Sequence, residues 1–272
     1  MSADKSRLYW DGILQAGKES FQQSLWRVHS DRINISLLKR WLDERQFTDI
    51  LKTDLFDEAL SPGLFPFLRH RTQSMHGIDL SVEAVDLAKS RFPEILASCA
   101  DVRDLPFSGD YFDLVVSNST LDHFQSKEQI AVAIRELFRV LKPGGELLIT
   151  LDNPQNPIVG LRGLLPFSWL KRLQLVPYFV GKTCSRRELT AELEEAGFKV
   201  LKTRAILHCP RVLAVHIAGI LGKRASQKSR GRFLSLLEKF ECLGTAPTRF
   251  FTGHYVACLA LKPEVHPVRD SR

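Results

Sequence analysis

The chain contains 272 residues, of which 44% are hydrophobic and 25% are charged, and these are ordinary values for a globular protein. The composition therefore excludes a disordered, collagen-like or coiled-coil chain. The formal net charge of +7 permits attraction to phosphate groups or anionic lipid but demonstrates neither, because net charge bears on association rather than on fold.

The cysteines and the N-terminal residues indicate in which cellular compartment the protein is expected. The five cysteines are widely spaced and form no C-x-x-C pair, so neither a disulfide framework nor a metal site is expected. The N-terminal residues lack the apolar segment of a signal peptide, and charged side chains interrupt the two most apolar stretches, 157–181 and 206–222. We therefore expect a soluble protein of the reducing cytoplasm.

The first 47 residues are expected to be helical, because Ile33, Leu37 and Trp41 belong to an apolar series at helical spacing. From about residue 48, short apolar strands alternate with amphipathic helices, which is typical of βαβ units and a parallel sheet. The expected strands are 49–56, 74–81, 95–102, 112–119, 145–152, 198–203 and 254–262, and the helix after the second strand is 82–92. The sequence thus predicts an α/β fold preceded by helices.

Two helices have sequence signals at their first turn. The pattern predicts a helix over 127–142, with Ser126 as its N-cap and Gln129 three residues later. Another helix is expected to begin at Ser185, with Glu188 as the partner in a capping box.

Two long segments, 153–183 and 205–250, interrupt the alternation. The first is Pro-rich and apolar, and the second contains a basic loop at 223–232. Insertions after the strand ends of an open sheet commonly form lids over a binding site. The expected organisation is an N-terminal helical segment, a main domain containing both lid-type insertions, and a polar tail, over residues 1–47, 48–262 and 263–272.

An acidic residue, Asp79, stands with Leu80 at the end of the second expected strand. A carboxylate at this position can accept hydrogen bonds from both hydroxyls of a ribose. The alternative is structural, because Asp79 also precedes a helix N-cap at Ser81, where negative charge is favourable in any case. The residues alone leave these two interpretations balanced.

Two further strand ends carry polar residues. Asp101, followed by the backbone N–H of Val102, can bind the amino group and ring nitrogen of an adenine, although an ordinary polar turn is the alternative. The fourth expected strand ends in Ser117 and Asn118, and an open α/β sheet holds its ligand at the carboxyl end of a central strand.

These segments resemble the class I S-adenosylmethionine-dependent methyltransferase family, in its small-molecule branch. The resemblance is close over residues 48–152 and looser to residue 262. It rests on four motifs in the order of that family: GIDLS (77–81), ADVRDLPF (100–107), YFDLVVSN (111–118) and RVLKPGGELLI (139–149).

The resemblance implies a fold and a cofactor. The implied fold is a Rossmann-like, seven-stranded and mostly parallel sheet with helices on both faces, N-terminal helices and a helical lid. The implied cofactor is S-adenosyl-L-methionine. In this resemblance Asp79 and Leu80 hold the ribose and Asp101 and Val102 hold the adenine. The implied contact at the flank of the cofactor is Ser117 or Asn118.

The chain departs from this family in the loop after the first strand. The family has a G-x-G-x-G loop there, because only glycine lets the backbone approach the methionine end of the cofactor. Residues 52–63 instead read KTDLFDEALSPG. In the functional interpretation, Lys52 binds the carboxylate of that methionine end, and Asp54 or Glu58 binds its ammonium. The alternative is a structural Lys52–Asp54 pair with cofactor binding weakened or lost.

His123 is the candidate catalytic base. It follows the fourth strand, where an acceptor is expected, and an imidazole titrates close enough to neutrality to remove a proton. The alternative is a half-exposed loop histidine that opens a helix.

The resulting hypothesis is methyl transfer from S-adenosylmethionine to a small apolar acceptor walled by residues 157–181. A lipid-like acceptor and peripheral membrane contact are compatible with the basic rim of that segment. Nucleic acid is not expected, because no basic module interleaved with aromatic residues is visible. The alternative is a catalytically inactive, methyltransferase-like binding or scaffolding protein. A nicotinamide-dependent oxidoreductase ranks behind both, because KPGGELLI has no role in that class.

Overall fold

The computed structural model describes residues 3–19, 24–165, 167–172 and 179–264. Its centre is a seven-stranded sheet in the order β3-β2-β1-β4-β5-β7-β6, in which β1 to β5 are parallel and β7 is antiparallel to both neighbours. The strands are β1 Phe47–Lys52, β2 Thr72–Asp79, β3 Ile95–Cys99, β4 Phe112–Asn118, β5 Leu141–Asp152, β6 Lys199–Ile206 and β7 Tyr255–Leu261. The mostly parallel, Rossmann-like sheet expected from the sequence is confirmed.

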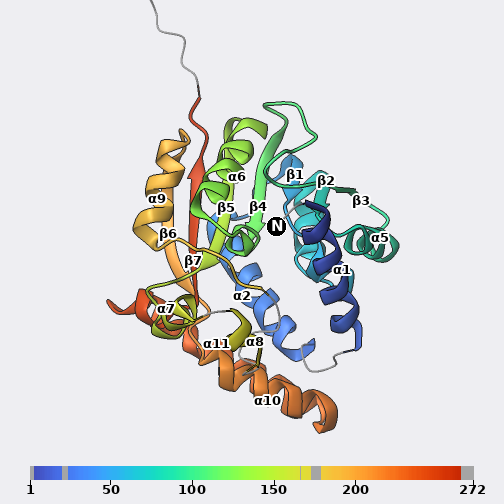
Figure 1. The fold of residues 1–272 in the computed structure, drawn as a ribbon, viewed down its shortest axis with the longest axis vertical. Coiled ribbons are helices and arrows are strands. Elements are labelled where there is room, and N and C mark those ends of the chain that lie inside the picture. Colours follow the sequence, from blue (N-terminus) through green and yellow to red (C-terminus); the bar gives the residue numbers. More distant parts are fainter. Residues whose placement is uncertain (1–2, 20–23, 166, 173–178, 265–272) are drawn as a thin grey trace, which may run out of the picture.

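Helices cover both faces of this sheet (Figure 1). One face packs against α6 (Lys127–Val140) and α9 (Arg186–Glu195). The opposite face packs against α2 (Ser24–Leu42), α4 (Phe65–Leu68) and α5 (Val82–Arg91). Because each central strand is buried on both sides, consecutive strand residues are apolar and contribute to different cores.

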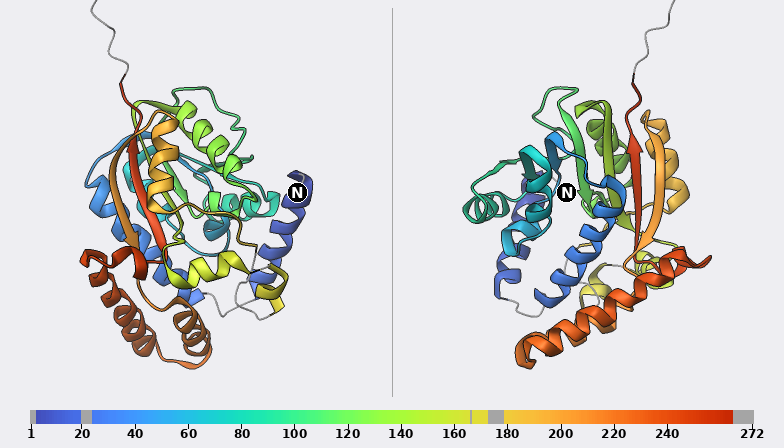
Figure 2. Two further views of the ribbon diagram at one scale, coloured as in Figure 1. Left: turned by 60° about the vertical axis from the view of Figure 1, so that its left-hand side comes forward. Right: turned by 180° about the vertical axis from the view of Figure 1, so that it is seen from behind.

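The inserted segments are helical and gather at the end of the sheet where the parallel strands have their carboxyl ends (Figures 1 and 2). They form α7 (Pro157–Leu164), α8 (Phe167–Arg172), α10 (Arg211–Arg224) and α11 (Gln227–Lys239), followed by α12 (Arg249–Thr252). The N-terminal α1 (Ala3–Glu19) packs against α5 and α3 (Phe56–Leu60). None of the described helices is long and apolar enough to cross a membrane.

The capping box predicted at Ser185 is confirmed. The Ser185 hydroxyl accepts a hydrogen bond from the backbone N–H of Glu188, and the Glu188 carboxylate accepts one from the backbone N–H of Ser185. After α9, Gly197 takes a backbone φ of +102°, which only glycine adopts without strain. Local sequence signals were sufficient for this helix because both of its ends are stabilised by neighbouring residues.

Two local predictions were wrong. Ser126 is the N-cap residue of α6 as predicted, but the capping box is absent: the Ser126 side chain makes no capping hydrogen bond, and the Gln129 side chain accepts the backbone N–H of Gln125 rather than that of Ser126. The segment 223–232 is not a loop, because Ser226 caps α11 and places residues 227–232 inside that helix.

Candidate functional site

A cavity of about 1330 Å³ lies at the carboxyl ends of the strands. We call its two sides the strand-end part and the lid part. The strand-end part is lined by residues that follow β1, β2, β3 and β4, including Asp54, Asp79, Leu80, Asp101, Val102, Asn118 and His123. The lid part is lined by residues from the end of β5, from α7 and from α10, including Asp152, Ile158, Arg162, Arg211 and Val215.

Asp79 ends β2 and combines both roles considered from the sequence. One carboxylate oxygen accepts the backbone N–H of Ser81 at 2.8 Å, and the other accepts the backbone N–H of Leu55 at 3.0 Å. Each oxygen keeps a lone pair for a further donor, because a carboxylate oxygen accepts two hydrogen bonds. Burial and the nearby Asp54 carboxylate raise the pKa of Asp79 to about 7. Asp79 therefore shapes the turn and also presents acceptors to the cavity.

Asp101 lies beside Asp79 along the same edge and lines the cavity together with Val102. Its carboxylate accepts the backbone N–H of Arg103 at 2.9 Å and forms an ion pair with the Arg103 guanidinium. Burial alone would raise the pKa of Asp101, but these contacts with Arg103 lower it below its usual value. The carboxylate is therefore ionised and held in place at neutral pH.

The turn after β1 presents carboxylates where a glycine-rich loop would present backbone donors. The backbone N–H of Leu55 is bonded to Asp79, and that of Phe56 is bonded to the Asp54 side chain at 3.0 Å. Asp54 and Asp57 line the cavity, and Arg27 from α2 forms an ion pair with Asp57. The electrostatics of this turn therefore suit a cationic group rather than an anionic one.

The structure corrects the prediction that Lys52 and Glu58 contact a ligand. Lys52 Nζ lies 2.8 Å from Glu58 Oε2, both side chains are buried, and neither lines the cavity. Burial would lower the pKa of Lys52, but the Glu58 and Asp54 carboxylates raise it instead. A Cβ on Gly63 would lie 2.4 Å from Glu58 Oε1, so the one glycine of this segment serves the buried carboxylate. Lys52 at the end of β1 and Glu58 in α3 therefore form a buried ion pair with each other.

The two candidate residues at the end of β4, Ser117 and Asn118, have different surroundings. Ser117 is fully buried and does not line the cavity, and its hydroxyl accepts a hydrogen bond from Thr53 Oγ1 at 3.0 Å. Asn118 does line the cavity, and its buried Oδ1 has no hydrogen-bond partner among the described residues. An acceptor atom of this kind is costly without a donor, so Asn118 is the residue of this pair that is prepared for a ligand.

His123 lines the cavity where the strand-end and lid parts meet. Its Nδ1 lies 3.0 Å from the backbone oxygen of Phe179, and its ring packs edge-on against Trp10 with centroids 4.8 Å apart. Phe179 belongs to the segment expected as the acceptor wall, and it does line the cavity. Sequence reasoning did not assign Trp10 to the site, because α1 reaches it only through tertiary folding. Tyr178, expected in the acceptor wall, lies outside the described residues.

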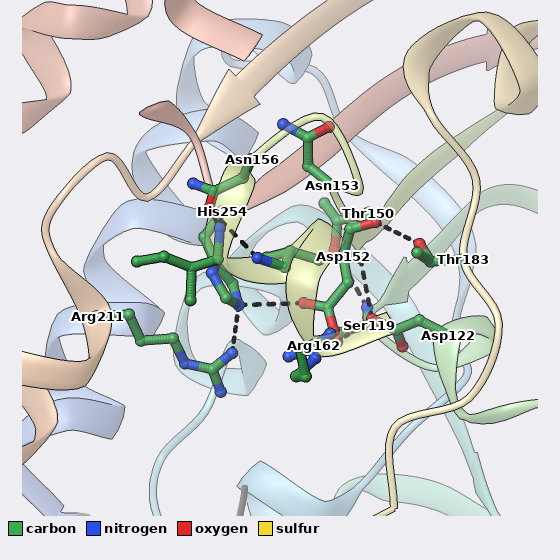
Figure 3. A network of polar contacts seen from close by, with 12 residues as sticks. Ser119, Asp122, Thr150, Asp152, Asn153, Asn156, Arg162, Thr183, Arg211 and His254 are labelled. Carbon is green, nitrogen blue, oxygen red and sulfur yellow. Dashed lines mark hydrogen bonds and ion pairs between the residues drawn. The ribbon is translucent and has the colours of Figure 1, made fainter. Parts of the chain in front are cut away.

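The lid part contains a polar cluster that sequence reasoning missed (Figure 3). Asp152 forms an ion pair with Arg162, and its Oδ1 lies 3.2 Å from Nε2 of His254. The same histidine nitrogen contacts the guanidinium of Arg211. The detectable signal was Asp152, which is an acidic residue at the carboxyl end of a strand, as Asp79 is.

Comparisons with known proteins agree with this geometry. Residues 62–149 match the family model described as a methyltransferase domain. The chain is 34% identical over 113 residues to the Bos taurus protein named "Probable tRNA methyltransferase 9B", covering 41% of this chain and 24% of that protein. It is 28% identical over 132 residues to a Mycolicibacterium smegmatis protein named "Probable S-adenosylmethionine-dependent methyltransferase", covering 48% and 46%. The matches thus span less than half the length of these relatives.

Solved structures show the same fold. The phosphoethanolamine N-methyltransferase 2 of Haemonchus contortus in complex with S-adenosyl-L-methionine superposes with a TM-score of 0.56 at 18% identity, covering 85% of this chain and 52% of that chain. The [4+2]-cyclase SpnF superposes with a TM-score of 0.57 at 19% identity, covering 86% and 81%. At such identities the likeness concerns the fold alone.

Residues 62–149 match a methyltransferase domain, and the fold around them is that of the class I S-adenosylmethionine-dependent methyltransferases. The cofactor of this family is S-adenosylmethionine, and the residues lining the strand-end part fit it. Asp79 has lone pairs for ribose hydroxyls, Asn118 Oδ1 is without a donor, and Asp54 and Asp57 suit positive charge. The names of the tRNA-modifying relatives give no support to the sequence-based expectation that nucleic acid is not a partner.

Proposed function

We propose that this protein transfers a methyl group from S-adenosylmethionine to an acceptor in the lid part of the cavity. The observation that carries the proposal is that one cavity joins the strand-end part to the lid part. When bound, S-adenosylmethionine supplies a methyl group on a sulfonium, which is already electrophilic. The chain's own contribution is to align donor and acceptor and to exclude water.

In this proposal different residues of the strand-end part bind different parts of the cofactor. Asp79, beside Leu80, accepts the ribose hydroxyls, and Asp101 with the backbone N–H of Val102 holds the adenine. Asp54 faces the positive charges of the methionine end, and Asn118 accepts a donor at its flank. This assignment is supported by their common position along the cavity wall.

The decisive experiment is calorimetric titration with S-adenosylhomocysteine, followed by turnover with labelled S-adenosylmethionine and candidate acceptors. Tight binding with turnover supports the proposal. Binding without turnover on any acceptor favours the inactive binding or scaffolding protein that the absent glycine loop suggests. Absence of binding contradicts methyl transfer and also favours the inactive protein, in which cofactor binding is weakened or lost.

A small apolar acceptor is supported by the lid part, whose walls include Ile158, Val212, Val215 and Ile220. A tRNA acceptor is the second candidate, favoured by the 113-residue match to a protein named as a tRNA methyltransferase. Total tRNA and a panel of small apolar acids and alcohols, offered as separate acceptors in the turnover assay, distinguish these two classes.

His123 is proposed as the base that removes a proton from the acceptor. His123 Nδ1 lies 3.0 Å from the backbone oxygen of Phe179, and Nε2 lies 3.8 Å from Oδ1 of the buried Asp122. We expect His123→Asn to lower kcat by about 10²–10⁴-fold. The affinity for S-adenosylhomocysteine, measured by calorimetry, should remain unchanged.

A value of kcat within about threefold of wild type would contradict a proton-transfer role for His123. The melting temperature provides a second readout, since His123→Asn should leave it unchanged.

Peripheral membrane contact is proposed from apolar side chains exposed beside the cavity. They belong to α7, α8 and α10 and do not line the cavity: Leu161, Leu164, Trp169 and Leu213. We expect the protein to sediment with anionic vesicles at low salt and less at high salt, because basic residues of α11 add attraction that salt screens. Leu161→Glu with Leu164→Glu should abolish sedimentation.

The matched control is Leu96→Glu with Leu201→Glu, which places the same two charges on exposed leucines of the edge strands β3 and β6. Negligible pelleting of the wild type with anionic and neutral vesicles at both salt concentrations would refute membrane contact and leave an acceptor that diffuses freely.

A further inference from the structure

The polar end of the lid part is assembled from four separate segments (Figure 3). Asp152 ends β5, Arg162 projects from α7, Arg211 is the first residue of α10, and His254 directly precedes β7. All four line the same cavity. Their convergence is a property of the tertiary fold and has no counterpart in the cofactor motifs.

The net charge of this cluster is positive. Burial and the neighbouring Arg211 lower the pKa of His254 to about 4, so the imidazole is neutral at pH 7. Burial would raise the pKa of Asp152, but His254, Arg162 and Arg211 hold it well below its usual range. Burial and Asp152 raise the pKa of the underlying Asp122, which favours its neutral form. Two guanidiniums therefore face one carboxylate that is certain to be charged.

The cluster has hydrogen-bond donors left for a ligand. Among the described residues, the guanidinium of Arg162 has one partner, Asp152, although a guanidinium carries five N–H donors. Asp152 is 4% exposed, and its Oδ1 lies 3.2 Å from His254 Nε2. The first turn of α10 carries no acidic residue, and Pro210 provides no side-chain cap, so the positive end of that helix adds to the same field.

The cluster is also held rigidly. Asn156 caps α7 by accepting the backbone N–H of Ile158, while its amide donates to the backbone oxygen of Thr252. Asn153 donates to the backbone oxygens of Phe250 and Gly253, next to His254. Two asparagines thus tie the helix that carries Arg162 to the segment that carries His254. A site held in this way loses little conformational entropy when a ligand binds.

We propose that the lid part recognises an anionic group, a carboxylate or a phosphate, between Arg162 and Arg211. That this group belongs to the methyl acceptor rests on the proposed function. Guanidiniums bind these anions through paired hydrogen bonds. The apolar remainder of the ligand lies along Ile158, Val212 and Val215, which line the same part of the cavity.

The test is binding of decanoate, decyl phosphate and decanol, each by calorimetry with and without S-adenosylhomocysteine. The three probes share one alkyl chain, so differences among them report the head group. We expect at least one of the two anions to bind about 10- to 100-fold more tightly than decanol, as charge-assisted hydrogen bonds predict. The tighter anion identifies the carboxylate or the phosphate as the preferred group.

Arg211→Gln should weaken binding of the preferred anion by about 10-fold or more and leave decanol unchanged. The matched control is Arg187→Gln, which removes an exposed arginine from the first turn of α9 and should change neither probe. The charge-balanced double variant Asp152→Asn with Arg162→Gln removes an ion pair without stranding a buried charge. It should lose anion binding while keeping its melting transition.

Equal affinity for decanol and both anions in the wild type would overturn the inference, as would an unchanged anion affinity in Arg211→Gln. Binding of S-adenosylhomocysteine tests the methyl-transfer proposal separately from the anion site. If that molecule binds and the anions show no preference, only the anion site is refuted. If the anions show the preference and S-adenosylhomocysteine does not bind, the anion site stands and the methyl-transfer proposal fails.

Discussion

Replacing Asp79 by alanine is expected to lower the affinity for S-adenosylhomocysteine by about 100-fold or more. In the proposed site the variant loses two charge-assisted hydrogen bonds to the ribose, each contributing about 1.5–3 kcal/mol. Calorimetric titration at pH 8 measures the loss. The control is Asp104→Ala, which removes an exposed carboxylate close to Asp101 that does not line the cavity. Binding by Asp79→Ala within about threefold of wild type would show that the cofactor lies elsewhere.

The pH dependence of wild-type binding provides an independent check on Asp79. Its pKa of about 7 in the ligand-free protein results from burial and from Asp54. The ionised carboxylate is the form that accepts both ribose hydroxyls and favours a nearby cation. Affinity should therefore be full above pH 7 and fall by about 10-fold for each unit of pH below it. In Asp79→Asn this dependence should flatten, because the amide does not titrate.

Replacing Lys52 by methionine is expected to destabilise the protein by about 3–5 kcal/mol, since it leaves the Glu58 carboxylate buried without its cation. At about 2–4 °C per kcal/mol for a chain of this size class, the melting temperature should fall by roughly 10 °C. Thermal denaturation followed by circular dichroism measures the change. The structure makes this outcome the expected one, because Lys52 does not line the cavity.

The double variant Lys52→Met with Glu58→Gln separates lost charge pairing from lost packing. Glu58 Oε1 accepts the backbone N–H of Leu64 at 2.9 Å, and a glutamine oxygen can accept the same hydrogen bond. Most of the stability should therefore return in the double variant. A stable Lys52→Met protein with weakened cofactor binding would reverse this interpretation and restore a direct role for Lys52.

Much of the fold follows from local patterns. Most strands lie close to their expected positions, because apolar runs of strand length bounded by turn residues depend on few neighbours. The first strand was extended too far, since β1 ends at Lys52 rather than at residue 56 and α3 begins at Phe56. Deviations occur where a residue has a tertiary partner. The expected helix over 127–142 ends at Val140, since Leu141 already pairs with Phe112 across β4 and β5.

The residues of the candidate site were also predicted only in part from the sequence. Asp79, Asp101 and Asn118 were found from the sequence because the carboxyl ends of parallel strands converge at one edge of a sheet. The same rule placed Ser117 among the candidates, and only the structure shows it turned into the core, where it bonds Thr53.

By itself the sequence determined the α/β class, the order of its elements and the acidic residues at the strand ends, since these depend on spacing along the chain. Only the tertiary structure decided that Lys52 pairs with Glu58, because that choice depends on the path of the backbone through Gly63. Tertiary structure alone also brought Arg162 and Arg211 to Asp152, since their segments lie far apart in sequence and meet only when the insertions pack over the sheet.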